Sequence, residues 1–177
     1  MHCINDKIPG WMSRAELIWL HAQALDMASV AEIGCWRGRS TYALLTGCLG
    51  PVYAIDHWKG DPNDESQRQE AYMHDIFSEF MQNVGWFNNL RVMRMSSEMA
   101  SMEFDNTGAS VEMLFIDGDH TQQAAGEDLR MWMGKCTKLL CGHDLDITGV
   151  EKALEQYEVK WQHGPGSIWY AYKGEGF

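Results

Sequence analysis

The sequence lacks any apolar run near the roughly 20 residues that a membrane-spanning helix needs. Its first residues also lack the basic start and apolar stretch of a secretory signal peptide, so we expect an intracellular, cytoplasmic protein outside the membrane. Basic residues are few, with 14 Lys and Arg against 25 Asp and Glu, and they form no cluster. Because a net charge of −11 repels a phosphate backbone, nucleic acid is disfavoured as a partner. We expect a small-molecule substrate instead.

The five cysteines also lack a pattern. Their number is odd and none is spaced C-x-x-C, so neither a disulfide framework nor a thiolate zinc site is indicated. The eight Trp and twelve Met are explained by packing in the core and in a pocket rather than by a recognition surface. The 177 residues predict one domain, 1–177, with an N-terminal segment and helix in 1–28 and a core in 29–173. Trp11, Trp161 and Trp169 are candidates for an interface between copies of the chain.

Strand-like and helix-like segments alternate along the chain. The expected strands are short apolar stretches at 29–33, 51–55, 90–95, 111–116 and 138–141. Helical spacing of apolar residues predicts helices at about 14–27, 40–48, 70–84, 121–139 and 149–157. Ser13 and Glu16 have the spacing of a capping box at the start of the first helix. This alternation favours an α/β fold with a mostly parallel sheet.

The last segments differ, because 159–163 and 167–172 flank a Gly-Pro-Gly turn and predict an antiparallel hairpin. Residues 62–69 are polar and carry no apolar period. We expect a loop there, either solvated or closing over a crevice through Asp61, Pro62, Asp64 and Glu65. This loop, from 60 to 69, and residues 1–13 are the candidate segments for acceptor specificity.

Ionisable residues follow two of the apolar strands. Asp117, Asp119 and His120 come directly after 111–116, and Gly142-His143-Asp144 follows 138–141. In open α/β sheets ligands bind beyond the carboxyl ends of the strands, so these side chains are expected to face a crevice.

The opposite part of the crevice has the pattern of a nucleotide site. Glu32 ends the first strand, Gly34 and Gly38 follow where the chain turns into a helix, and Asp56 ends the second strand. An acidic residue about 20 positions after such glycines often holds the hydroxyl groups of a ribose. A glycine turn and a solvated aspartate are the alternative interpretation of the same residues.

Together these motifs resemble the class I S-adenosylmethionine-dependent methyltransferases, and more narrowly the small stand-alone branch called methyltransferase family 24. The resemblance covers about residues 29–173 and implies a doubly wound, Rossmann-like seven-stranded sheet of order 3-2-1-4-5-7-6. It implies that Glu32 lies near the methionine part of the cofactor, that Gly34 and Gly38 shape its loop, that Asp56 binds the ribose, and that Ser97 lies beside the adenine.

The predicted cofactor wall also includes Cys35, Trp36, His57 and Asp117. Trp36 departs from the family pattern, in which a glycine is frequent at this place, so we expect its ring to point away from the cofactor. The motif is also short of the fuller glycine loop that a dinucleotide pyrophosphate needs, which disfavours a dehydrogenase.

Asp117, His143 and Asp144 are the predicted metal ligands, with Mg²⁺ or Mn²⁺ as the ion. Related metal-dependent O-methyltransferases carry carboxylates or amides at both places, so His143 is a departure that shifts the preference toward Mn²⁺, Fe²⁺ or Zn²⁺, or indicates no metal. A hydrogen bond between aspartate and histidine is the alternative.

For catalysis we name Asp117, Asp119 and His120. His120 is the predicted base, since an imidazole titrates near neutral pH, and Asp119 either orients it or contacts substrate. The alternative role of His120 is to cap the next helix or to form a hydrogen bond with Asp119. The resulting hypothesis is methyl transfer from S-adenosylmethionine to an oxygen, less favourably a nitrogen, of a small polar acceptor. A non-catalytic cofactor-binding module and a metal-dependent hydrolase are the competing hypotheses.

Overall fold

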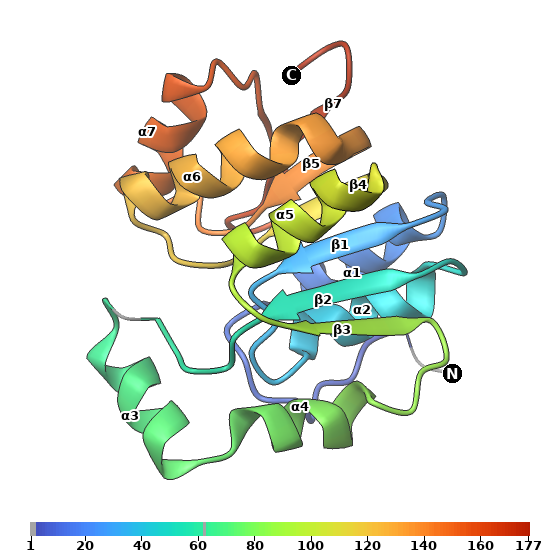
Figure 1. Ribbon diagram of the computed structural model, residues 1–177, viewed down its shortest axis with the longest axis vertical. Coiled ribbons are helices and arrows are strands. Elements are labelled where there is room, and N and C mark those ends of the chain that lie inside the picture. The colour runs from blue at the N-terminus through green and yellow to red at the C-terminus, as the bar shows by residue number, and fades with distance from the viewer. Residues whose placement is uncertain (1–2, 62) are drawn as a thin grey trace.

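The computed structural model describes residues 3–61 and 63–177, and its seven strands form one sheet (Figure 1). The strands are β1 (Val30–Ile33), β2 (Val52–Asp56), β3 (Leu90–Arg94), β4 (Val111–Ile116), β5 (Cys136–Gly142), β6 (Gln162–His163) and β7 (Trp169–Tyr172). Their order is β3-β2-β1-β4-β5-β7-β6, which confirms the predicted fold class.

Strand direction places the functional end of the sheet. The pairs among β3, β2, β1, β4 and β5 are all parallel, whereas β7 runs antiparallel to both β5 and β6. The carboxyl ends of β1, β2, β4 and β5 therefore meet at one edge. The connections diverge between β1 and β4, and in such sheets this divergence opens the ligand crevice.

Helices cover both faces of the sheet. They are α1 (Arg14–Ala24), α2 (Arg39–Gly47), α3 (Glu65–Met73), α4 (Ile76–Val84), α5 (Ser97–Thr107), α6 (Gln122–Trp132) and α7 (Thr148–Gln156), with a short 3-10 turn at Met133–Lys135. Figure 1 shows α5, α6 and α7 on one face and α1 and α2 on the other. It also shows α3 extending away from the sheet.

Alternation along β4 explains the two layers. Met113 and Phe115 pack with the helices α1 and α2, while Leu114 and Ile116 pack with α5, α6 and α7. All four side chains are buried, and each contributes roughly 1.5–3 kcal/mol by leaving water. Because both faces are covered, this central strand is almost wholly apolar until it ends. The first ionisable group after it, Asp117, is therefore at the crevice.

The predicted helix at 70–84 is wrong in its bounds, since two helices occupy this region. α3 begins at Glu65, inside the predicted polar loop, where the Asp64 carboxylate accepts hydrogen bonds from the amides of Ser66 and Gln67. No residue of α3 is buried, so an apolar period could not reveal it. Pro62 lies outside the described residues. α4 begins after Asp75, which caps it through the amide of Ser78.

Two further boundaries differ from expectation. The helix α5 was not predicted, because its small buried set, Ala100, Ser101 and Phe104, gives a weak pattern. The helix expected at 121–139 ends at Trp132, and β5 already begins at Cys136. Among the described residues no helix has both the length and the apolar character needed to cross a membrane.

Candidate functional site

A cavity of about 530 Å³ opens at the carboxyl ends of β1, β2, β4 and β5. Most of the predicted site residues line it, from five separate stretches of chain. These are Gly34, Cys35, Trp36, Asp56, His57, Ser97, Asp117, Asp119, His120, His143 and Asp144. The other two, Glu32 and Gly38, are buried and are not among its wall residues.

The loop after β1 is fixed by backbone geometry. Gly34 has φ +84°, and a Cβ there would lie 2.1 Å from the carbonyl oxygen of Asp117. Only glycine fits such a position, because an L side chain disfavours this φ and the neighbouring strand end leaves no space. Gly38 has φ +86° and is the N-cap of α2. The backbone conformation of this loop therefore explains why glycine occupies both predicted positions.

Asp56 holds this loop from the end of β2. One of its oxygens, Oδ2, accepts hydrogen bonds from the amides of Cys35 and Trp36, both at 2.9 Å, and Oδ1 accepts one from the amide of Trp58 at 2.6 Å. The carboxylate still lines the cavity, as does its neighbour His57. A carboxylate offers about four lone-pair sites, so capacity remains for a hydroxyl group.

Trp36 has φ +47°, a conformation that glycine adopts more easily. Its ring lies beside that of Trp11, with 6.1 Å between centroids, and its carbonyl accepts a hydrogen bond from the indole of Trp58 at 2.8 Å. Trp36 and Trp11 both line the cavity, and Trp11 is 66% exposed. The unusual residue thus forms part of an aromatic wall with the N-terminal segment.

Glu32 is the one fully buried acid of β1. The hydroxyl of Thr41 donates to its Oε2 at 2.5 Å, and within the described part of the chain Oε1 has no hydrogen-bond partner. Burial raises the pKa of Glu32 to about 7, although hydrogen bonds from Ser40 and Thr41 oppose that rise. A buried carboxylate with only one of its oxygens hydrogen-bonded costs folding free energy. Its presence here favours a role for Glu32 in binding a ligand.

Ser97, the residue predicted beside the adenine, belongs to a small network. Its hydroxyl donates to the carboxylate of Asp128 and accepts a hydrogen bond from the indole of Trp132 at 2.8 Å. Burial raises the pKa of Asp128 to about 6 despite the hydrogen bond from Ser97. Sequence reasoning missed Asp128, yet a signal was present: it lies one residue before Leu129 and four before Trp132, on the buried face of α6.

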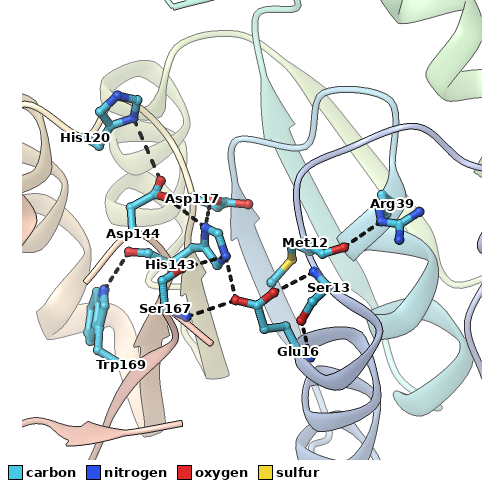
Figure 2. Close-up of polar contacts among 10 residues, drawn as sticks. All are labelled: Met12, Ser13, Glu16, Arg39, Asp117, His120, His143, Asp144, Ser167 and Trp169. Atoms are coloured by element: carbon cyan, nitrogen blue, oxygen red, sulfur yellow. Dashed lines mark hydrogen bonds and ion pairs between the residues drawn. The ribbon is translucent and has the colours of Figure 1, made fainter. Parts of the chain in front are cut away.

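At the other end of the cavity, His143 lies among three carboxylates (Figure 2). Its Nδ1 is 3.0 Å from Asp144 Oδ1 and 3.6 Å from Asp117 Oδ1. Its Nε2 is 2.9 Å from Oε1 of Glu16, which comes from α1. The side chain of His143 is only 10% exposed, and its carbonyl accepts a hydrogen bond from the indole of Trp169 at 3.1 Å. The imidazole therefore has a fixed orientation.

These groups alter one another's proton affinity. Burial lowers the pKa of His143, but the hydrogen bond to Asp144 and the charges of Asp117, Asp144 and Glu16 outweigh it and raise the value to about 9. Burial also raises the pKa of Asp117 well above its usual range, against the opposing charge of His143. Carboxylates gathered in a partly buried place need a cation nearby.

The predicted metal ligands have a suitable geometry. One ligand atom each from Asp117, His143 and Asp144 can be chosen so that all lie within 4.8 Å of one another. Adjacent ligands of an ion that binds at about 2.1 Å lie about 3 Å apart, close to the separations of Nδ1 from the two aspartates. Two carboxylates and one imidazole suit Mn²⁺ or Fe²⁺ as well as Mg²⁺. The residues therefore fit a divalent ion.

Asp144 has φ +59°, which is rare for a residue other than glycine. Backbone strain of this kind persists where the surrounding structure over-determines it, and it is frequent at functional sites. Here β5 has just ended at Gly142, where a Cβ would lie 2.4 Å from the ring of Trp169. The strained turn brings both His143 and Asp144 to the cavity.

His120 is 35% exposed, and its Nδ1 lies 3.8 Å from Asp144 Oδ2. The two oxygens of Asp119 are engaged elsewhere: Oδ1 accepts from the amide of Thr121 and Oδ2 from the amide group of Asn63, both at 2.8 Å. Thr121 is the N-cap of α6. In this structure Asp144, rather than Asp119, is therefore the acid next to His120.

Two features of this end were missed from the sequence. The sequence predicts Glu16 only as part of a capping box, and it does not show that the side chains of residues 9–12 line the cavity. Arg39 fixes that wall, because its guanidinium donates to the carbonyls of Ile8 at 2.6 Å and Met12 at 2.9 Å. A basic residue at the start of α2 opposes the helix dipole, and this was the available signal.

Comparisons with known proteins agree on one family of folds. A family model for the methyltransferase domain of methyltransferase family 24 matches residues 31–141. No curated protein matches the chain by sequence. Solved structures do match. They include cofactor-bound Rv0187 from MTB, with a TM-score of 0.66, 15% identity and coverage of 96% of this chain and 85% of that one.

Two further structures are similar. The O-methyltransferase from Bacillus cereus in complex with SAH has a TM-score of 0.65 at 17% identity, covering 94% of this chain and 84% of that one. CalS11, a TDP-rhamnose 3'-O-methyltransferase of calicheamicin biosynthesis, has a TM-score of 0.61 at 15% identity. The match covers 90% of this chain and 78% of CalS11. At such identities the likeness establishes the fold.

Proposed function

This chain belongs to methyltransferase family 24, a family of class I S-adenosylmethionine-dependent enzymes, and from that premise we propose that it methylates an oxygen of a small polar acceptor. The observation that carries the choice of oxygen is the convergence of Asp117, His120, His143 and Asp144 at one end of the cavity. Carboxylates with an imidazole can hold a divalent ion and remove a proton, and a hydroxyl group needs such help before it can attack.

The half of the cavity around β1, β2 and Ser97 binds the cofactor in this proposal. Asp56 accepts the ribose hydroxyls with the lone pairs that the loop amides leave free. Glu32, Gly34, Cys35 and Gly38 shape the methionine end, and the wall at Ser97 contacts the adenine. S-adenosylmethionine, when bound, supplies an electrophilic methyl group on its sulfonium.

The other half binds the acceptor. Asp117, His143 and Asp144 would hold a divalent ion, and such an ion, when bound, would supply Lewis acidity beside the acceptor's hydroxyl group. His120 takes up the hydroxyl proton at a ring nitrogen. Asp144 lies 3.8 Å from the His120 ring and stabilises the positive charge that the ring gains. Asp119 orders the loop by binding Thr121 and Asn63, and contacts the acceptor from the same edge.

The first test is cofactor binding, measured by isothermal titration with S-adenosylhomocysteine. Wild type is expected to bind, and Asp56→Ala to bind at least tenfold more weakly, because it loses both the ribose contact and the clamp on two loop amides. Asp26→Ala removes an exposed acid as the matched control. Absence of binding to wild type would refute the proposal.

The second test is turnover with radiolabelled S-adenosylmethionine and a panel of sugars and other hydroxylated compounds. Label is expected in an acceptor, with a rate that rises with Mn²⁺ or Mg²⁺ and falls with a chelator. Cofactor binding without transfer to any acceptor would favour a binding module, and hydrolysis with metal alone would favour a hydrolase. Cytoplasmic location and assembly of like chains stay predictions.

A further inference from the structure

Glu16 does more than a capping box requires. Its Oε2 accepts a hydrogen bond from the amide of Ser13 at 2.6 Å, which is the expected cap of α1. Its Oε1 accepts from the amide of Ser167 at 3.1 Å and lies 2.9 Å from His143 Nε2 (Figure 2). The residue is only 4% exposed. One carboxylate thus joins the N-terminal helix, the turn that precedes β7 and the candidate metal site.

The other ring nitrogen of His143 faces the predicted ligands. Nδ1 lies 3.0 Å from Asp144 and 3.6 Å from Asp117, on the side of the ring opposite Glu16. A neutral imidazole carries hydrogen on one nitrogen and a lone pair on the other. Carboxylates lie at both ring nitrogens, Glu16 at Nε2 and Asp144 at Nδ1, and each can accept a hydrogen. An ion bound to Asp117 and Asp144 would take the place of the hydrogen on Nδ1, and the Glu16 carboxylate, which has only lone pairs to offer, then keeps the remaining hydrogen on Nε2. That form leaves the Nδ1 lone pair free to bind a cation.

We propose that Glu16 is a positioning residue for the metal site: it accepts the Nε2 hydrogen of His143 and so directs the Nδ1 lone pair toward the ion that Asp117 and Asp144 hold. This proposal rests on the metal-assisted form of the proposed function. Glu16 and His143 both lie outside residues 31–141, so the matched family segment does not contain this pair.

The neighbours of Glu16 support this assignment. Ser167 Oγ also lies 2.9 Å from Nε2, but a hydroxyl group can donate or accept and therefore selects neither form of the ring. Packing keeps the carboxylate in place, because a Cβ at Gly166 would lie 2.3 Å from Glu16 Oε1. Of the two groups at Nε2, the one that selects the form of the ring is thus the Glu16 carboxylate, and packing against Gly166 holds it in position.

The test is Mn²⁺ titration by calorimetry, at one pH and with saturating S-adenosylhomocysteine, of wild type and Glu16→Gln. Glutamine can keep the cap through its carbonyl oxygen, since Gln is tolerated in a capping box, but its amide group then faces His143 and donates to Nε2. The ring hydrogen then lies on Nδ1, so that this nitrogen has no lone pair to bind the metal ion. We expect the dissociation constant for Mn²⁺ to rise 10- to 100-fold, in the range found for outer-shell partners.

Ser13→Ala is the matched control. It removes the hydroxyl that accepts from the Glu16 amide at 3.4 Å, and so weakens the same cap, but leaves the carboxylate beside His143. Its Mn²⁺ affinity is expected to stay within about twofold of wild type. Equal affinity of wild type and Glu16→Gln would overturn the proposal. So would loss of affinity in Ser13→Ala as large as in Glu16→Gln, which would mean that helix stability sets the affinity.

Nitrogen-15 spectra of the wild-type histidines in the Mg²⁺-loaded protein give a readout that needs no variant. Hydrogen bonded directly to Nε2 of His143 supports the proposal, and hydrogen on Nδ1 overturns it. Wild type that binds S-adenosylhomocysteine but not Mn²⁺ also overturns it, together with metal assistance, while methyl transfer stands. Failure to bind S-adenosylhomocysteine is a different result, which refutes the proposed function itself.

Discussion

The two halves of the cavity are built in different ways. In the cofactor half, backbone groups dominate: Gly34 and Gly38 set the path of the loop, and Asp56 binds the amides of Cys35 and Trp36. In the acceptor half, side chains from distant segments meet, because His143 contacts Glu16 across 127 positions of the chain. The first half lies within residues 31–141, which the family model matches, and much of the second lies outside.

This difference follows from what each half must do. A shared cofactor requires one backbone path, which glycine and a strand-end acid specify locally. An acceptor differs from enzyme to enzyme, so its half is assembled from termini and loops that vary freely. We therefore expect substitutions to separate the halves, with cofactor affinity changed in one and turnover in the other.

The largest effect is expected for Gly34→Ala. The added methyl group would lie 2.1 Å from the Asp117 carbonyl oxygen, on a backbone with φ +84°, so the β1 loop and the β4 end must move apart. We expect a loss of more than about 4 kcal/mol in the free energy of unfolding, or loss of S-adenosylhomocysteine binding where the protein still folds. Denaturant unfolding and calorimetry measure the two.

Gly134→Ala is the control for this substitution, since a Cβ there meets nothing within 4 Å. It should leave stability and binding nearly unchanged. A Gly34→Ala protein that folds and binds S-adenosylhomocysteine like wild type would contradict the contrast between the two halves. The cofactor half would then not depend on the backbone path of the β1 loop.

The comparison also explains what the sequence could predict. The strand and helix alternation, the β1 glycines and the strand-end acids were readable, because each depends on local pattern: an apolar strand, a turn, then a polar group. The strand order followed from the family resemblance that these motifs carry. Asp56 and Asp117 line the cavity as expected from that pattern. The roles of these residues toward ligands stay predictions.

Most of the rest depends on tertiary contacts that a local pattern does not specify. Glu16 has the same S-x-x-E spacing whether or not its carboxylate reaches His143, and only the packing of α1 beside β7 decides this. The helix α3 has no buried residue, so hydrophobic period cannot show it; its cap at Asp64 was the only signal. Asp128 did give a signal, as a single acid on the buried face of α6, but its contact with Ser97 depends on tertiary packing.

The second largest effect is expected for His120→Ala and sharpens the separation of the halves. Loss of the base should lower turnover by roughly 10²-fold or more, while the dissociation constant for S-adenosylhomocysteine stays within a few fold. Single-turnover rates and calorimetry give the two values. His163→Ala, at an exposed histidine of β6, is the control. Full turnover in His120→Ala would remove this residue from the catalytic role.

Glu32→Gln tests the buried acid beneath the cofactor half. The pKa of Glu32 is raised by burial to about 7, so between pH 4.5 and pH 7 the folded state keeps a proton that the unfolded state has lost. The free energy of unfolding of wild type therefore falls as the pH rises through this window, by about 3 kcal/mol in total.

Glutamine has no proton to lose, so Glu32→Gln should be more stable than wild type by up to about 3 kcal/mol at pH 8 and should lose this advantage at pH 4. Urea unfolding at several pH values measures the difference. Glu103→Gln, at an exposed position of α5, should show no such trend. We also expect weaker cofactor binding, since a retained destabilising acid indicates function. A pH-independent difference would contradict the assignment.

The smallest effect is expected for Trp132→Phe, which tests whether the cofactor half also uses side chains. The indole of Trp132 donates to the Ser97 hydroxyl at 2.8 Å, and that hydroxyl in turn donates to Asp128. Phenylalanine removes the donor but keeps most of the buried ring, so one hydrogen bond worth about 1 kcal/mol is lost. The free energy of unfolding should fall accordingly, and the dissociation constant for S-adenosylhomocysteine should rise by at most about fivefold, the limit reached if the whole hydrogen bond serves to orient Ser97. Trp86→Phe loses a comparable indole bond, to the carbonyl of Asn83 at an exposed position, and should bind like wild type. If both variants bind alike, the cofactor half is held by its backbone alone, and the contrast between the halves becomes sharper than the structure suggests.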